Sequence, residues 1–309
     1  MPKIEMRKHE ITTFEELFLH FIKHCKIKNV SPKTIIYYET SYNSICKFNP
    51  NIQLDEIDSL LIQDYILYLK QTNNLNSVNT RLKGLRTMLN YGYSINALPK
   101  IKVQLIRVDK EVKETYSTEQ ILTLIKKPNV KKCSFAEYRN WMIVHYLVST
   151  GNRLSTLTNI KIGDLDIDNK LVTLRHTKNR HQQIIPLSSM LCKHLVEYLT
   201  YREGTSEDYL FPTVENKQLT KDTLITAIKN YNRSRGVNIT SIHAFRRYFA
   251  KQCVLNGIDT FTLQKLGGWK DLTVVKNYIE IYATDIKDYD MINPLDTIYS
   301  EKIKNKTKR

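Results

Sequence analysis

Cysteine is scarce in this 309-residue sequence, and its five occurrences are widely scattered. Their number is odd and no two form a Cys-x-x-Cys pair, which argues against both a disulfide framework and a zinc ribbon. The same usage fits a reducing compartment, so we expect the protein to be cytoplasmic. The cysteines are Cys25, Cys46, Cys133, Cys192 and Cys253.

Long apolar runs are also missing. No stretch approaches the roughly 18 apolar residues that a membrane-spanning helix needs. The charged N-terminus, with Lys3, Arg7 and Lys8, is not followed by the apolar core of a signal peptide. Neither a Walker A sequence nor a convincing carboxylate cluster for Mg²⁺ is present. We therefore expect no membrane partner, no metal and no nucleotide cofactor.

Acidic residues are the minority among the charged ones. Against 47 Lys and Arg there are 31 Asp and Glu, which gives a formal net charge of +16 and an isoelectric point near 9.4. Such an excess favours polyanions through counterion release, so nucleic acid is the leading partner. The alternative is an ordinary globular protein with a basic surface, since the hydrophobic share of 41% is typical of a chain that buries cores.

Residues 11–95 have the spacing of consecutive helices. Thr12-x-x-Glu15 predicts a capping box at the first, and Ser31-Pro32 predicts the start of the second. Two further helices are predicted at 58–70 and 77–91.

The helix predicted at 77–91 has two distinct faces. Leu82, Leu85 and Leu89 form an apolar stripe along one side. Basic residues lie off this stripe, where they either face solvent or contact phosphate groups. These candidate DNA-binding residues are Arg81, Lys83 and Arg86.

The second half of the chain mixes helices with one hairpin. Pro99 to Glu114 lacks a clear period and is predicted to be an extended linker. Ser117-x-x-Gln120 predicts a helix start, and another apolar helix is predicted at 138–149. Leu171–Leu174 and Gln183–Leu187 flank a polar tip and are typical of a β-hairpin. The predicted fold is mainly α with a small β-hairpin or sheet: a helical domain at 11–98, a linker at 99–115, an α+β domain at 116–298 and a basic tail at 299–309.

Arg153 and Lys178 are the first residues of this half that could act on a phosphate. Arg153 follows a Ser149-Thr150-Gly151 bend, where glycine permits a sharp turn before the next helix. The arginine could instead cap that helix or pair with Asp164 or Asp166. Lys178 lies at the hairpin tip, where lysines often serve solubility, yet a lysine there is also suited to protonate a departing oxygen.

His243 and Arg246 lie three positions apart, so both project from one face of a helix. Thr240 and Ser241 are candidate N-caps, and the positive end of such a helix also favours a phosphate. A His-x-x-Arg pair also arises by chance, so the pair alone is a weak signal. Arg247 either contacts a nucleic-acid backbone, faces solvent or pairs with an acid.

Trp269 follows two glycines, and Tyr278 lies nine residues after it. The pair Gly267-Gly268 stops a helix and permits close backbone approach. The indole that follows is either a hydrogen-bond donor to a phosphate or an aromatic core anchor. Tyr278 is the candidate nucleophile, with Tyr282 as its competitor, and its phenol needs nearby cations or a base to attack at neutral pH.

These residues, in this order, resemble the catalytic set of the tyrosine recombinases, the family of phage-type integrases and site-specific recombinases. The resemblance covers about residues 11–285 and includes Ser31-Pro32-Lys33-Thr34-Ile35 and Ser77-Val78-Asn79-Thr80, which are similar to the family's SAM-like core-binding domain. Trp269 stands where most members have a second histidine, as in the Cre-like variant. Thr156 stands where members often carry an acid near the first arginine. The residues on catalytic positions are Arg153, Lys178, His243, Arg246, Trp269 and Tyr278.

The resemblance implies that DNA is cut and rejoined without metal or ATP. The two arginines and the indole would hold the scissile phosphate. His243 would assist proton movement, Lys178 would serve the leaving 5′-hydroxyl, and Tyr278 would form a 3′-phosphotyrosyl link that leads to a Holliday junction. The implied partners are double-stranded DNA recombination sites, further copies of the chain in a tetramer on paired sites, and accessory or directionality proteins. The implied location is the nucleoid.

Two other functions fit the same residues. A type IB topoisomerase uses the same nucleophile and phosphate clamp but relaxes supercoils, and the helical N-terminal half favours the recombinase over it. A non-catalytic DNA-binding protein could retain the fold, although the intact residue set argues against loss of activity. Among recombinases, integration, cointegrate resolution and chromosome-dimer resolution share this chemistry, and the sequence does not separate them.

Overall fold

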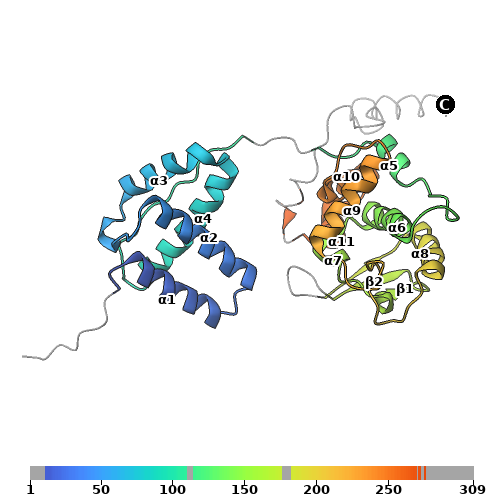
Figure 1. Ribbon diagram of the computed structural model, residues 1–309, viewed down its shortest axis with the longest axis horizontal. Coiled ribbons are helices and arrows are strands. Elements are labelled where there is room, and N and C mark those ends of the chain that lie inside the picture. Colours follow the sequence, from blue (N-terminus) through green and yellow to red (C-terminus); the bar gives the residue numbers. More distant parts are fainter. Residues whose placement is uncertain (1–10, 110–113, 176–181, 270, 273–274, 276–309) are drawn as a thin grey trace, which may run out of the picture. The chain divides into compact units, whose positions relative to one another are not determined.

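The computed structural model describes residues 11–109, 114–175, 182–269, 271–272 and 275. The chain divides into two compact units, Met1–Glu111 and Val112–Arg309. Figure 1 shows the described part of the first in blue to cyan and that of the second in green to orange. None of the helices among the described residues combines the length and the apolar character that a membrane span requires.

Unit 1 is a bundle of α-helices around one core. Its elements are α1 (Phe14–Ile27), α2 (Pro32–Phe48), the 3₁₀ turn η1 (Leu54–Glu56), α3 (Ser59–Thr72) and α4 (Leu75–Ser94). Helix α4 packs against the other three helices. Its stripe of Leu82, Leu85 and Leu89 is fully buried, which confirms the predicted apolar face.

Helix α1 begins one residue later than predicted. The capping box is made by Thr13 and Glu16, not by Thr12 and Glu15. The Thr13 hydroxyl accepts from the Glu16 amide at 3.1 Å, and the Glu16 carboxylate accepts from the Thr13 amide at 3.1 Å. Both pairs fit the sequence pattern, so local propensity alone did not decide between them. The decision is tertiary, because Phe14 is buried and its amide donates to the Ile52 carbonyl.

Part of the predicted linker packs on the core of unit 1. Val103 is buried, and Ile101 and Ile106 lie against the same core. Asn79 of α4 holds the Ile106 backbone twice: its Nδ2 donates to the Ile106 carbonyl and its Oδ1 accepts from the Ile106 amide, each at 2.8 Å. The chain is therefore bound to unit 1 as far as Ile106, while the bounds 99–115 stay a prediction.

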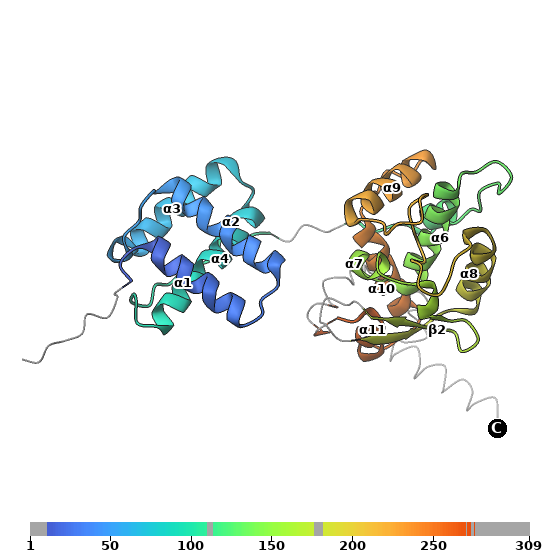
Figure 2. The same ribbon diagram turned by 60° about the horizontal axis from the view of Figure 1, so that its bottom comes forward.

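Unit 2 is organised around one long helix. Helix α6 (Phe135–Thr150) contacts α8 (Ser189–Arg202), α9 (Lys221–Ser234) and α10 (Ile242–Leu255), and it lies between α8 and α9 in Figures 1 and 2. The remaining helical elements are α5 (Thr118–Leu124), α7 (Leu154–Leu157), η2 (Ile162–Asp164) and α11 (Thr260–Gly267).

A small antiparallel sheet completes unit 2. Strands β1 (Leu165–Asp166), β2 (Leu171–Leu174) and β3 (Gln183–Pro186) pair in the order β1-β2-β3, with Val172 opposite Ile185. The predicted hairpin is confirmed, and so is the mainly α fold with a small sheet. Strand β1 was not predicted, because two residues are too few to show an alternating pattern.

Candidate active site

The site begins at the C-terminal end of α6. Gly151 caps this helix in the left-handed conformation, with φ of 58°. A Cβ at this position would be strained, and it would also lie 2.4 Å from the ring of Phe249. The chain then enters α7 with Arg153 at the N-cap position. The bend predicted from Ser149-Thr150-Gly151 thus places Arg153 beside the end of α6.

Arg246 of α10 is almost completely enclosed, with 1% of its surface exposed. Its Nη1 donates to the Gly151 carbonyl at 2.7 Å, and its Nη2 donates to the Gly267 carbonyl at 2.6 Å. These carbonyls lie at the C-terminal ends of α6 and α11, where the helix dipole is negative and stabilises a cation. The guanidinium is therefore fixed in place by the ends of two other helices.

Trp269 covers the guanidinium of Arg246. The carbon of the guanidinium lies 4.0 Å from the centre of the indole, within cation–π range. The indole is 4% exposed and packs in a small cluster with Leu263 and Val275. Trp269 is therefore an aromatic core anchor that also contacts Arg246, and its donation of a hydrogen bond to a phosphate stays a prediction.

The Gly267-Gly268 turn holds both arginines through its backbone. The Gly267 carbonyl accepts from Arg246, and the Gly268 carbonyl accepts from Arg153 Nη2 at 2.8 Å. Gly268 is left-handed, with φ of 58°, and a Cβ on Gly267 would lie 1.8 Å from the Trp269 ring. The indole can fold back over Arg246 only because Gly267 has no side chain.

The acids named as alternative partners for Arg153 make other contacts. Asp164 pairs with Arg175 at 2.6 Å, and Asp166 accepts from Asn169. Thr156 is buried in α7. A backbone carbonyl, that of Gly268, therefore helps to orient Arg153.

Gln183 supports the glycine turn and was not singled out from the sequence. Its Nε2 donates to the Lys265 carbonyl at 2.6 Å, and its Oε1 would lie 2.6 Å from a Cβ on Gly268. Strand β3 is thereby joined to the C-terminal end of α11. A glutamine in a strand has no motif, so no sequence signal pointed to this contact.

Of the other candidate catalytic residues, the structure describes His243 but not Lys178 or Tyr278. His243 is exposed in the first turn of α10, one turn before Arg246, and Ser241 occupies the N-cap position. Lys178 and Tyr278 lie outside the described residues. Val275, three positions before Tyr278, is buried in the cluster that contains Trp269, so Val275 itself is anchored beside the site.

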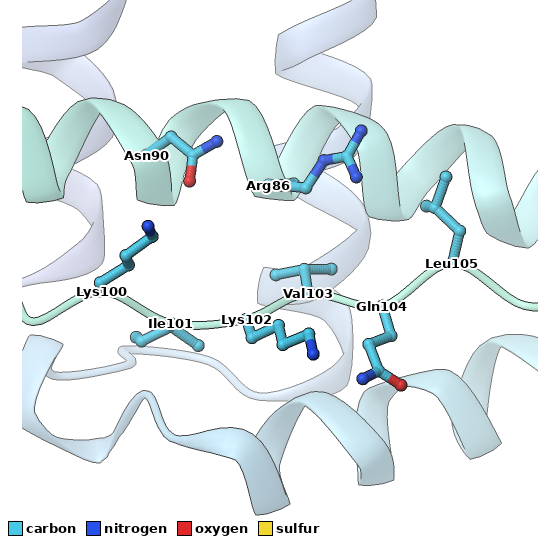
Figure 3. Close-up of a pocket in the computed structure, with 8 residues that line it drawn as sticks. All are labelled: Arg86, Asn90, Lys100, Ile101, Lys102, Val103, Gln104 and Leu105. Atoms are coloured by element: carbon cyan, nitrogen blue, oxygen red, sulfur yellow. The ribbon is translucent and has the colours of Figure 1, made fainter.

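The candidate DNA-binding residues of α4 lie on its outer side. Arg81 is half-buried, whereas Lys83 and Arg86 are exposed. Arg86 lines an open groove of about 830 Å³ between α4 and the segment 100–105, shown in Figure 3. Lys100 and Lys102 also line it, which makes this groove basic.

Arg247 of α10 makes a contact that the sequence interpretation did not include. Its Nε and Nη2 both donate to the backbone carbonyl of Glu114, at 2.9 and 2.5 Å.

Among the described residues, no group of three or more His, Cys, Asp or Glu side chains is placed to hold a metal ion.

Gly267→Ala is expected to displace the Trp269 indole, because the new Cβ would overlap it. Such overpacking typically costs about 1–3 kcal/mol, and the change should also alter tryptophan fluorescence. Gly257→Ala is the matched control, since its Cβ would have nothing within 4 Å and only its φ of 84° adds strain. Unfolding midpoints and fluorescence of the two variants give the measurement; equal losses with unchanged fluorescence would contradict the overlap.

The geometry can be compared with known families. Residues 114–284 match the model described as the phage integrase family, and residues 13–108 match the phage integrase SAM-like domain. The chain belongs to the phage integrase family. Its members are tyrosine recombinases, so this phage integrase is an enzyme that acts in DNA recombination.

Named relatives agree with this membership. A tyrosine recombinase of Pseudothermotoga lettingae is 24% identical over 287 residues, which cover 90% of this integrase and 96% of the relative. The tyrosine recombinase XerA of Pyrococcus furiosus is 29% identical over 185 residues, which cover 59% and 62% of the two chains.

Solved structures share the fold of this integrase. The Tn1549 transposon integrase in complex with transposon right end DNA has a TM-score of 0.73 at 18% identity, covering 90% of this chain and 98% of that one. A lambda integrase tetramer bound to a Holliday junction has a TM-score of 0.70 at 15% identity, covering 88% and 78%.

Proposed function

We propose that this integrase is a site-specific recombinase that cuts and rejoins double-stranded DNA through a covalent 3′-phosphotyrosine at Tyr278. The observation that carries the proposal is the Gly267-Gly268 turn. Its two carbonyls accept hydrogen bonds from Arg246 and Arg153, so both guanidinium groups are held at the same turn. Guanidinium groups are planar forks that match the non-bridging oxygens of a phosphate.

The two arginines stabilise the charge that develops on the phosphate during transfer. Arg246 is held by two carbonyls and covered by Trp269, so little rearrangement accompanies the reaction. Preorganised donors of this kind are usually the largest electrostatic contribution to such catalysis. In the proposal, the Trp269 indole adds a donor at the position where most relatives have a second histidine, as in the Cre-like variant.

The chemical step exchanges one phosphoester bond for another. The Tyr278 oxygen attacks phosphorus and gives up its proton to His243 or to a phosphate oxygen, with His243 assisting that proton movement. The 5′-oxygen of the DNA leaves and is protonated by Lys178. The phosphotyrosine conserves the bond energy, so the 5′-hydroxyl of a second site can attack it in turn. This transfer needs neither a metal ion nor ATP.

Recombination by this route joins two DNA sites through a Holliday junction. We infer that four copies of the chain act on two paired sites and that accessory or directionality proteins are further partners. The structural relatives include a dimer and a tetramer on DNA, which supports this assembly. Association with the nucleoid follows from such a substrate.

The test is a suicide substrate, a nicked duplex from which the short cleaved strand diffuses away. The sequence of the duplex is to be taken from the DNA that flanks the gene, read for inverted repeats. We expect a covalent protein–DNA adduct that survives denaturation, followed by strand exchange between two sites. Supercoil relaxation without exchange would favour a type IB topoisomerase, and no adduct would favour a non-catalytic DNA-binding protein.

DNA affinity is expected to fall steeply with salt, since each neutralised phosphate releases counterions. Arg86→Ala and Lys102→Ala should each reduce the slope of log affinity against log salt by about one, because both side chains line the basic groove. Lys127→Ala is the control, since this lysine pairs with Glu197. Fluorescence anisotropy over a salt series gives the slopes; unchanged slopes for both groove variants would exclude the groove from binding.

A further inference from the structure

The first described residues of unit 2 lie along helix α10. The Glu114 carbonyl accepts from Nε and Nη2 of Arg247, at 2.9 and 2.5 Å. The Thr115 hydroxyl donates to the Ala244 carbonyl at 3.4 Å. Where the chain enters unit 2, it is therefore bound to α10 at once.

Tyr116 continues this attachment. Its ring stacks on Phe245 of α10, with centroids 4.3 Å apart. Its hydroxyl donates to the Ile239 carbonyl at 3.2 Å and accepts from Asn232 Nδ2 at 2.8 Å. Both the Tyr116 and the Phe245 side chains are buried, so this contact is part of the core of unit 2.

The attached turn of α10 is the one that carries the candidate catalytic residues. Residues 114–116 contact Ala244 and Phe245, which lie between His243 and Arg246, and Arg247, which directly follows Arg246. Successive helical residues point about 100° apart, so neighbouring side chains reach different surroundings. Arg246 joins this turn to the active site, and Arg247 joins it to the chain that arrives from unit 1.

The other end of the connection is also attached. In unit 1 the Asn79 side chain bonds both backbone groups of Ile106, and Asn79 lies on α4, the helix that carries Arg86. Only residues 107–113 separate the two attachments. The eight steps from Ile106 to Glu114 span at most about 28 Å when fully extended.

We propose that Arg247 is a positioning residue, which fastens the connection between the units to α10 and so transmits DNA engagement by unit 1 to Arg246 and His243. The inference rests on the proposed recombinase function and replaces a direct DNA contact as the role of Arg247. In the proposal, DNA binding by unit 1 exerts a force on the Glu114 carbonyl through this short connection. Two hydrogen bonds from one guanidinium pass that force to the helix of the active site.

The first experiment separates positioning from DNA binding. Arg247→Ala in the full chain should lower the single-turnover rate of adduct formation about tenfold, the loss expected for charge-assisted hydrogen bonds. DNA affinity and its salt slope should stay as in the parent protein. Arg247→Lys keeps the charge but not the fork, so its cleavage should stay reduced. A salt slope lowered by about one in Arg247→Ala and restored in Arg247→Lys would show a phosphate contact and overturn the proposal.

The second experiment tests transmission through the tether. Inserting Gly-Ser-Gly-Ser between Lys110 and Glu111 should slow cleavage at saturating protein, and Arg247→Ala should then add little further loss. Coupled sites are non-additive in such a cycle, whereas independent ones add. The same tenfold loss in both backgrounds would mean that Arg247 merely supports α10 locally, which would sink the proposal.

The two proposals fail in different ways. If the parent protein forms no adduct on any substrate, the recombinase function is wrong. The attachment is then still tested by amide exchange, which Arg247→Ala should accelerate at Thr115 and Tyr116; unchanged protection would count against it. If the parent cuts DNA and Arg247→Ala cuts equally fast, the function stands and the positioning role falls. Arg233→Ala, an exposed arginine on α9, is the charge-matched control.

Discussion

Tyr278→Phe should abolish covalent attachment to DNA while leaving DNA affinity within about twofold of the parent protein. The change removes only the phenolic oxygen that would bond to phosphorus, and a phenyl ring has no nucleophile to replace it. The arginines, which bind the phosphate in the proposal, stay in place. The measurement is adduct formation on the suicide substrate, resolved on a denaturing gel, beside anisotropy for binding.

Tyr282→Phe is the matched control for this experiment. It removes the same oxygen from the competing tyrosine, four positions further along the chain. Cleavage by Tyr282→Phe should stay close to that of the parent. If Tyr278→Phe still forms adducts and Tyr282→Phe does not, then Tyr282 is the nucleophile and the assignment from spacing to Trp269 is wrong.

Arg246→Ala has the second largest expected effect, a fall in cleavage rate of about 10² to 10³-fold. In the proposal this guanidinium supplies charge to the phosphate, and in the structure it joins the ends of α6 and α11. Loss of a preorganised donor at a reacting centre typically costs ~3–4 kcal/mol of transition-state stabilisation. The variant also leaves the carbonyls of Gly151 and Gly267 without this donor in a buried site, so the unfolding midpoint should drop too.

Two further variants separate these contributions. Arg246→Lys keeps a positive charge but cannot reach both carbonyls with a planar fork, so it should recover little activity. Arg153→Ala should slow cleavage to a similar degree with a smaller loss of stability, because Arg153 is only half-buried. Rates from single turnovers and midpoints from thermal unfolding give both quantities. Cleavage by Arg246→Ala near the parent rate, in folded protein, would remove the arginine from the mechanism.

Local sequence patterns predicted many features of the fold well. Ser31 and Ser117 stand at the N-cap positions of their helices, as their spacing to the following residues indicated, and Ser241, one of two candidates, occupies the N-cap position of α10. The hairpin followed from two short segments, Leu171–Leu174 and Gln183–Leu187, that flank a polar tip, and the apolar stripe of α4 followed from its helical spacing. These features depend on neighbours a few positions apart, which a sequence displays directly.

Other features needed the packed structure. The pattern of Thr12 and Glu15 equals that of Thr13 and Glu16, and only the burial of Phe14 selects the second pair. Gln183 and Arg247 act through backbone carbonyls far away in the chain, those of Lys265 and Glu114. Backbone acceptors exist at every residue, so no sequence pattern shows which one a side chain reaches.

By itself, the sequence determined the order and chemistry of the candidate catalytic residues, the glycines at the two tight turns and the strong positive charge. It did so because residue type and short spacing decide helix ends, turns and charge. Only the tertiary structure decided that Arg153 and Arg246 meet at one glycine turn and that Arg247 holds the incoming chain. Those contacts join helix ends and loops through long-range packing, which depends on how whole helices lie against one another.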